Sequence, residues 1–159
     1  MSTHKVRRAT SEDAHAVAEL GARVRELHAR KHPEEFCRPE VEETVDFFRG
    51  LIERAGSTLL VAEDESFAIV GYAFATVKNE PASIFKPPRS ILDLEQMAVA
   101  ESVEGKGYGG ALLHAVDNLA DEMKVDEIRL VVWSFNEHAI GLYEHAGYAP
   151  IRVEMTRRR

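Results

Sequence analysis

The sequence predicts a single domain of the mixed α/β class that spans residues 1–159. This length is enough for one substantial hydrophobic core and too short for two. Segments whose apolar residues recur at helical spacing alternate with short β-rich segments, and the chain has no internal repeat and no low-complexity segment. Taken in order, these segments predict the arrangement β-α-α-β-β-β-α-β-α-β.

The first half of the chain predicts two helices and three strands. A hydroxyl cap at Thr10 begins the first helix, which ends at about Arg30. Pro39 suits the first position of the second helix, and Gly56 ends that helix. The predicted strands are 6–9, 58–62 and 67–77, of which the last two pair through the acidic turn 63–65.

The second half predicts two more helices and three more strands. Three prolines make 79–89 an exposed connection with little regular structure. An apolar stripe from Leu112 to Met123 marks the third helix, and Gly147 closes the fourth. The predicted strands are 90–100, 127–133 and 151–155, and the fourth helix covers 136–146.

Composition excludes several classes of protein. No apolar run approaches the roughly 20 residues that span a bilayer, and no secretory signal is recognisable, so a cytoplasmic location without a membrane is expected. Cys37 is the only cysteine, which excludes an internal disulfide and a thiolate zinc cluster. The net charge of −7 argues against a nucleic-acid partner, and nine acids against two bases in 93–127 favour a small cationic substrate.

Four glycines lie just ahead of the third helix, at positions 105, 107, 109 and 110. Glycine lets the backbone turn sharply and present several N–H groups to one point. A helix N-terminus adds about half a positive charge, so this loop is suited to bind an anion. The alternative is a tight helix entry that binds nothing.

The same letters satisfy the dinucleotide fingerprint G-x-G-x-x-G, with Asp126 about twenty residues further on. We reject this interpretation because the preceding strand carries charge and is separated from the first glycine by several residues. Too few residues follow for a doubly wound sheet. A P-loop is excluded because no Gly-Lys-Ser/Thr follows.

A second motif lies downstream, from Asn136 to Tyr148, with the spacing N-x-x-A-x-x-L-Y-x-x-x-G-Y. With the glycine loop, it resembles the GNAT superfamily of acetyl-CoA-dependent N-acetyltransferases. The family pattern Q/R-x-x-G-x-G/A falls on 104–109. The family's asparagine, tyrosine and Gly-aromatic pair fall on Asn136, Tyr143 and Gly147-Tyr148. Element order agrees over essentially the whole chain.

The resemblance implies one GNAT-like domain, in which a mixed, mainly antiparallel sheet is flanked by helices and its central strand pair splays apart. Acetyl-CoA is the implied cosubstrate, with its pantetheine arm in the splay against main-chain groups of the strand 90–100. One N–H there would polarise the thioester carbonyl, a contribution of about 3 kcal/mol. The implied cofactor-binding residues are Met97, Ala98, Val99, Glu104, Gly105, Lys106, Gly107, Tyr108, Gly109, Gly110, Asn136 and Tyr143.

The reaction implied by the resemblance is direct transfer of acetyl to an amine, and it needs two proton transfers. Tyr143 is the implied general acid for the departing sulfur; the alternative is a packed core tyrosine. Asp93 and Glu95 share one face of a regular strand, and each matches an acid that deprotonates the amine in some branch of the family. Glu95 is favoured slightly because it is nearer Met97, and the alternative is that both acids simply face solvent or attract a cationic substrate.

Glu104 departs from the family, which usually has Gln or Arg there. Backbone N–H groups from Lys106 to Gly110 are expected to make the phosphate contacts, so the carboxylate should weaken binding only modestly. Asn136 caps the fourth helix in either interpretation. No metal is expected, because the histidines at 138 and 145 lack further ligands.

The sequence therefore favours an acetyl-CoA-dependent N-acetyltransferase acting on a primary amine of a small cationic acceptor. Two alternatives stay open: a non-catalytic acyl-CoA-binding sensor or scaffold and, more remotely, a nucleotide-binding domain. A homodimer is compatible with the sequence. The acceptor pocket is expected between the segments 28–48 and 78–89, with His32, Phe36, Phe47, Phe48 and Phe85 as candidate lining residues.

Overall fold

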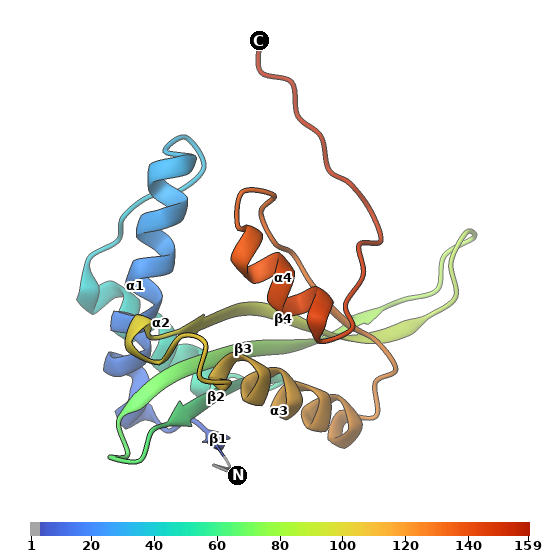
Figure 1. Ribbon diagram of the computed structural model, residues 1–159. Coiled ribbons are helices and arrows are strands. Elements are labelled where there is room, and N and C mark those ends of the chain that lie inside the picture. The colour runs from blue at the N-terminus through green and yellow to red at the C-terminus, as the bar shows by residue number, and fades with distance from the viewer. Residues whose placement is uncertain (1–3) are drawn as a thin grey trace.

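The computed structural model describes residues 4–159 and contains one five-stranded sheet in the order β1-β2-β3-β4-β5 (Figure 1). The first four strands pair antiparallel with their neighbours, and β4 pairs parallel with β5. The strands are β1 Lys5–Arg8, β2 Ser57–Glu63, β3 Ile69–Glu80, β4 Arg89–Val99 and β5 Ile128–Leu130.

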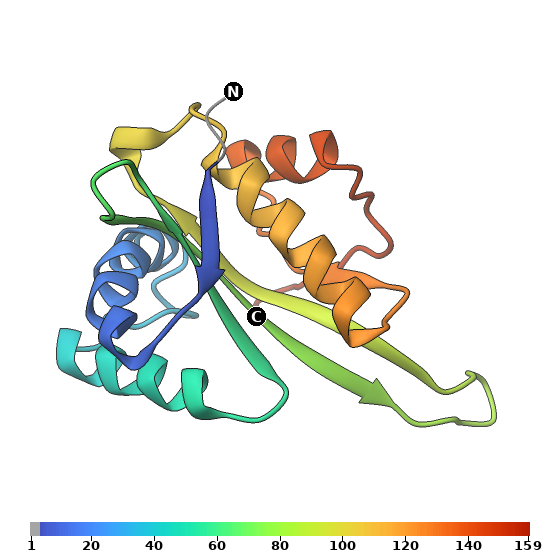
Figure 2. The ribbon, with the colours of Figure 1, turned by 90° about the horizontal axis from the view of Figure 1, so that it is seen from below.

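Helices cover both faces of the sheet (Figure 2). On one face, α1 Ala14–Lys31 and α2 Val41–Glu53 pack against β2 and β3. On the other, α3 Tyr108–Met123 packs against β2, β3 and β4, and α4 Glu137–His145 lies beside it. Successive residues of β2 point into opposite cores, which is why this strand is apolar without interruption.

The order of elements predicted from the sequence is confirmed as far as α4. The second helix is shorter than predicted. It begins after Glu40, whose N–H donates to the Glu43 side chain at 3.1 Å, so Pro39 lies outside the helix. It ends at Glu53 because Arg54 adopts an extended conformation.

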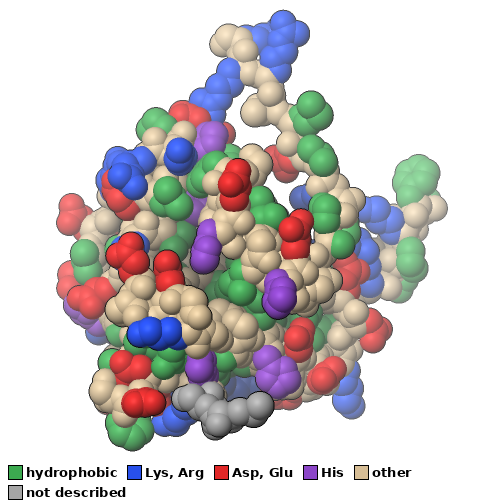
Figure 3. All heavy atoms as spheres, in the orientation of Figure 1, with side chains coloured by type: hydrophobic (Ala, Val, Ile, Leu, Met, Phe, Trp, Pro, Cys, Tyr) green, Lys and Arg blue, Asp and Glu red, His purple; other side chains and the backbone are tan. Residues whose placement is uncertain are grey.

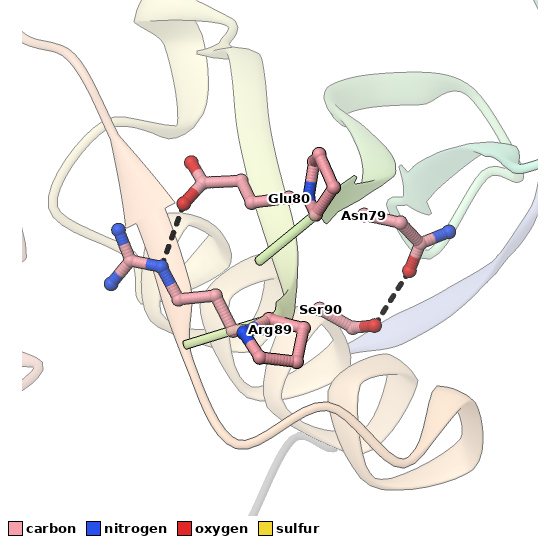
Figure 4. Close-up of a pocket in the computed structure, with 6 residues that line it drawn as sticks. Asn79, Glu80, Arg89 and Ser90 are labelled. Carbon is pink, nitrogen blue, oxygen red and sulfur yellow. Dashed lines mark hydrogen bonds and ion pairs between the residues drawn. The ribbon is translucent and has the colours of Figure 1, made fainter. Parts of the chain in front are cut away.

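The connection 79–89 is more regular than predicted, because β3 and β4 continue into an arm that projects from the sheet (Figure 1). Figure 4 shows the base of this arm, where Glu80 and Arg89 point toward each other and Asn79 faces Ser90. The Arg89 Nε donates to Glu80 at 2.7 Å, and the Ser90 hydroxyl donates to Asn79 at 2.6 Å. The prolines of 81–88 lie where this ladder of paired residues has already ended.

The C-terminal part of the chain differs most from the prediction. The strand predicted over 127–133 is limited to Ile128–Leu130. The strand predicted over 151–155 is wrong for this structure, because residues 149–159 are exposed and have no strand partner within the described chain. The segment has the alternating pattern of a strand, but strand structure also needs a neighbour to complete its hydrogen bonds.

Candidate active site

β4 and the edge strand β5 separate after three paired positions. β4 and β5 pair at Leu92 with Ile128, at 93 with 129, and last at Leu94 with Leu130. β4 then continues to Val99, still paired with β3 on its other side. Within the described residues, the edge of β4 over 95–99 therefore has no strand neighbour, and this is the splay that the resemblance implied. Met97, Ala98 and Val99 all lie on this stretch.

A β-bulge at Glu95 interrupts the regular strand that the sequence analysis assumed. Leu94 pairs with Ala75 and Gln96 pairs with Phe74, so Glu95 is an extra residue without a partner on β3. The bulge reverses which residues face which core. Before it, Leu92 and Leu94 pack toward α3; after it, the residues that do so are Met97 and Val99.

Asp93 and Glu95 nevertheless share one face, because the same lysine contacts both. Lys78 on β3 donates a short hydrogen bond to the Asp93 carboxylate, and its Nζ lies 3.9 Å from Glu95 Oε1. This hydrogen bond to Asp93, with the charges of both carboxylates, raises the pKa of Lys78 above its usual value. The ammonium thus stays charged at neutral pH, so it cannot accept a proton there.

The glycine loop forms a tight turn that leads directly into α3. Gly105 and Gly107 have φ angles of 73° and 91°, in the left-handed region where side chains are disfavoured. Gly107 is the N-cap residue of α3, whose first-turn N–H groups belong to Tyr108, Gly109 and Gly110. The first N–H groups of an α-helix have no carbonyl group one turn earlier to bind, so these three are suited to bind an anion.

The structure shows how Lys106 and Glu104, two residues of the loop, lie relative to the expected phosphate contacts. The Lys106 N–H donates to the Val103 carbonyl at 3.2 Å, which leaves the set from Gly107 to Gly110 for a ligand. The Lys106 ammonium donates to the Ser102 carbonyl at 2.9 Å. Glu104 is exposed at the turn, and its carboxylate is not buried against the helix N-terminus.

Tyr143 is held on the same side of the sheet as the glycine loop. Asn136 caps α4 by accepting the Ala139 N–H at 3.3 Å, which confirms the predicted cap and fixes the start of this short helix. The ring of Tyr143 packs against the α3 core with Met97, and its centroid lies 5.9 Å from that of Tyr148. Burial raises the pKa of Tyr143 above its usual value, so the phenol keeps its proton at neutral pH.

A close approach of α3 to α4 joins the glycine loop to the helix that carries Tyr143. A Cβ at Gly109 would lie 3.0 Å from a terminal methyl group of Leu142, so the two helices approach closely at this glycine. Leu142 directly precedes Tyr143. The structure therefore brings together the loop, the splayed stretch of β4 and Tyr143.

The candidate acceptor residues divide into three groups. Phe48 is fully buried in the core under α1 and α2, and Phe47 is exposed beside it. Phe85 is exposed in the connection between β3 and β4, and no ring contact joins it to the other candidates within the described chain. His32 and Phe36 do lie together, against Trp133 at centroid distances of 4.7 and 5.3 Å.

Trp133 belongs to an aromatic cluster that the sequence analysis missed. Its rings come from α1, from the loop after α1 and from the segment after β5. The helical spacing of His28 and His32, with an aromatic residue just after a β-rich stretch, is the signal that could have revealed it. The cluster consists of His28, His32, Phe36, Trp133 and Phe135.

Neither a metal centre nor a membrane span is found in the described part of the chain. Among residues 4–159, no group of three or more His, Cys, Asp or Glu side chains could hold a metal ion. None of the helices described is long and apolar enough to cross a bilayer.

The strand β4 separates from β5, and the helix α3 begins directly after a glycine turn. Together these two features are those of the acyltransferase class to which the two sequence motifs pointed. The model of the acetyltransferase (GNAT) family matches residues 21–148. The chain belongs to this family, whose members use acetyl-CoA as cosubstrate.

Individual relatives agree with this assignment. Over 97 residues, the chain is 34% identical to mycothiol acetyltransferase of Propionibacterium freudenreichii subsp. shermanii; the match covers 61% of this chain and 29% of the relative. A tetramutant of the BH1408 protein from Bacillus halodurans superposes with a TM-score of 0.92 at 26% identity, over 98% of this chain and 99% of that one.

A more distant structure shows the same fold. The ribosomal-protein-alanine N-acetyltransferase of Brucella melitensis biovar Abortus 2308 superposes with a TM-score of 0.71 at 19% identity. The superposition covers 98% of this chain and 99% of that one.

Proposed function

We propose that this protein transfers the acetyl group of acetyl-CoA directly to a primary amine of a small, cationic acceptor. The observation that carries the proposal is the separation of β4 from β5 after Leu94. Tyr143 and the glycine loop lie on the face of the sheet that α3 covers, and the carboxylates of Asp93 and Glu95 lie on the opposite face. A direct transfer needs a proton acceptor for the amine and a proton donor for the thiolate, and these two sides supply one each.

The residues present fit acetyl-CoA. The first-turn N–H groups of Tyr108, Gly109 and Gly110 would hold its pyrophosphate, at a helix end that favours negative charge. The main-chain groups of 97–99, on the edge of β4 that β5 leaves, would hold the pantetheine arm. Acetyl-CoA supplies an acetyl group activated as a thioester.

Tyr143 is proposed as the general acid. Its phenol keeps its proton at neutral pH because burial raises its pKa, and its ring packs against the same α3 core as Met97 of the splayed strand. As the amine nitrogen bonds to the acetyl carbon and the carbon–sulfur bond breaks, Tyr143 donates its proton to the sulfur. The sulfur then leaves as a neutral thiol, so no thiolate charge has to form in a partly buried site.

Glu95 is proposed as the general base, directly or through one water. An acceptor amine has a pKa of about 10 and is mostly protonated at neutral pH, so its proton must be removed before attack. The Asp93 carboxylate is already engaged by the Lys78 hydrogen bond, whereas the Glu95 oxygen lies 3.9 Å from the same ammonium. Glu95 also sits at the bulge, directly beside the splayed stretch.

The proposed class of acceptor rests on charge. Asp93 and Glu95 lie at the proposed acceptor side, and Lys78 balances only one of the two carboxylates. A second positive group on the acceptor would be attracted to this face. The curated relative is named as an acetyltransferase, which supports acetyl as the acyl group.

Thiol release from acetyl-CoA, measured across a panel of amines, tests the proposal. Diamines and amino sugars should be acetylated faster than neutral amines of the same size, with the acetylated amine detected by mass spectrometry. Tight binding of acetyl-CoA without turnover on any amine would instead support the non-catalytic binding module.

A further inference from the structure

Arg25 lies on the stripe of α1 that faces the sheet, where a charged side chain is unusual. Gly21 and Ala29, one turn before it and one turn after it, are both buried, and the buried residues of α1 are all small or apolar. The Arg25 side chain is itself half-buried, and its Nη2 donates to the Ala18 carbonyl at 2.8 Å. A guanidinium at this position therefore needs a physical explanation.

Arg25 has no carboxylate partner in the described part of the chain, unlike the other two arginines of α1. Arg23 meets Glu101 at 2.6 Å, and Arg30 lies 4.0 Å from Glu26. Acidic side chains are scattered over the face that Figure 3 shows, and the whole chain carries a net charge of −7. A guanidinium keeps its charge in proteins, and a partly buried charge is favourable only when it is paired. An anionic ligand would supply the partner that the protein itself does not.

Gly21 gives the guanidinium its place against the sheet. A Cβ at Gly21 would lie 2.7 Å from Arg25 Nη1 and 2.7 Å from the Tyr72 hydroxyl oxygen, so both groups occupy space that a larger residue would fill. Burial raises the pKa of Tyr72 to about 12, so its hydroxyl keeps its proton and donates to the Gln96 amide oxygen at 3.2 Å. The Gln96 NH2 group is then left as a donor. Arg25 and Gln96 thus approach the same buried hydroxyl group.

These donors lie on the proposed acceptor side. Tyr72 belongs to the core under α1 and α2, so Gln96 lies on that face of the sheet, as do Asp93 and Glu95. Gln96 follows Glu95 directly on β4, at the bulge. Along this face of β4, the two carboxylates come first and the donors of Gln96 and Arg25 come next. The face therefore offers negative charge for an ammonium and, beside it, positive charge for an anion.

We propose that Arg25 binds a carboxylate group of the acceptor, so that the acceptor is an amino acid with a second amino group and not a simple polyamine. The reacting amine would meet Glu95 at the splay, while the carboxylate accepts hydrogen bonds from the Arg25 guanidinium and from Gln96. A guanidinium can present two parallel N–H donors to one carboxylate, which gives this contact its geometric specificity. The inference rests on the proposed acetyl transfer to an amine, since it names the class of acceptor.

Binding to the protein loaded with CoA tests the inference without any turnover, because CoA has no acetyl group to transfer. The probes are lysine and ornithine, each compared by calorimetric titration with its amide, which keeps both amino groups and lacks the carboxylate. At least one of the two amino acids should bind about 10–10²-fold more tightly than its amide, the usual range for a hydrogen-bonded ion pair. Equal affinities within both pairs, or no binding of any probe, would overturn the inference.

Arg25→Met removes the charge at similar side-chain length, and Arg23→Met is its matched control on the same helix. In Arg25→Met the amino acid should lose its advantage over the amide, while the affinities for the amide and for CoA should not fall. Arg23→Met should keep the full advantage, because Arg23 is exposed and paired with Glu101. Arg25→Lys keeps the charge but not the planar fork, so it should restore only part of the advantage. An advantage that survives in Arg25→Met would contradict the inference.

Turnover separates this inference from the proposed function. Thiol release from acetyl-CoA that is equally fast with the amino acids in the unaltered protein and in Arg25→Met, at subsaturating acceptor, would contradict the role of Arg25 and leave the acetyl transfer standing. Arg25-dependent binding of the amino acids without turnover of any amine would support the role of Arg25 and contradict the proposed function. The expected result is a fall in kcat/KM of about 10–10²-fold in Arg25→Met, carried by KM and absent with the amides.

Discussion

Leu94 and Leu130 form the last registered pair between β4 and β5, and the two strands part directly after it. The bulge at Glu95 follows this pair by one residue and turns Met97 and Val99 toward α3. One short stretch of strand thus combines an open main-chain edge, a carboxylate at its start and side chains that pack against the same core as Tyr143. The proposed transfer depends on these three features together.

The first prediction distinguishes the two carboxylates. Glu95→Gln should lower kcat by about 10²–10⁴-fold, the usual contribution of a general base. Asp93→Asn should lower it much less, because Asp93 already accepts the Lys78 hydrogen bond. Steady-state rates as a function of pH, at saturating acetyl-CoA, measure both. A larger loss in Asp93→Asn would assign the base to Asp93.

The second prediction uses two glycines of the same loop. Gly107→Ala should destabilise the protein by about 1–2 kcal/mol, the cost of a left-handed conformation for a residue with a Cβ. The new Cβ would also meet the His4 ring at 3.1 Å. Gly110→Ala should instead stabilise it by about 0.5–1 kcal/mol, because this residue is helical with open space around it.

Urea unfolding at pH 7 measures both glycine variants. Binding of CoA should weaken in Gly107→Ala, since the turn that presents the N–H groups is displaced. Equal stabilities for the two variants would mean that the left-handed turn is not maintained in solution.

The third prediction concerns Glu104. Its carboxylate is exposed and screened at physiological salt, so Glu104→Gln should tighten CoA binding by less than about fivefold. Calorimetric titration with CoA at low and high salt checks this, and the difference should shrink as salt rises. Weaker binding in the variant would mean that Glu104 makes a contact of its own with the ligand.

The fourth prediction concerns stability in acid. Asp13 accepts two hydrogen bonds from Arg7, at 2.8 and 3.0 Å, and the Thr10 N–H at 2.7 Å. The Arg7 hydrogen bond, foremost, lowers the pKa of Asp13 below its usual value. The unfolded chain therefore takes up this proton first, and the stabilisation is complete above about pH 4 and lost as pH falls through the lower, folded-state pKa.

Asp13→Asn should lower the free energy of unfolding by about 1.5–3 kcal/mol at pH 7. The difference in free energy of unfolding between the variant and the unaltered protein should become smaller as the pH falls. Asp46→Asn serves as the control, because Asp46 pairs with Arg49 in an exposed position and should have little effect. Urea unfolding between pH 7 and pH 2 measures how the free energy of unfolding of each variant depends on pH. A difference that stays constant over this range would contradict the assignment.

Local patterns were enough to predict most of the elements. Helix caps, apolar stripes and turn residues are encoded within a few positions of one another, so α3 after Gly107 and α4 after Asn136 were found from sequence. The prediction of a strand over 151–155 was wrong. The alternation of apolar and polar residues predicts which face of a strand is apolar, but it does not predict whether a neighbouring strand is present to pair with it.

Features that depend on distant segments were not predictable from one sequence. The bulge at Glu95 appears only in the register of β4 against β3. The aromatic cluster joins α1 to Trp133, about a hundred positions later, so the spacing of His28 and His32 marks candidates but does not predict their contact with Trp133. The hydrogen bond that occupies the Lys106 N–H likewise depends on how the turn closes on Val103.

Tyr143→Phe tests the central claim most directly, with Tyr148→Phe as its matched control. The Tyr148 hydroxyl is buried without a hydrogen-bond partner in the described chain, so its removal should leave the stability equal or slightly higher and kcat unchanged. Thiol release from acetyl-CoA, in the presence of the best amine, should fall by about 10²–10⁴-fold in Tyr143→Phe while CoA affinity stays the same. Full activity of Tyr143→Phe would contradict the account.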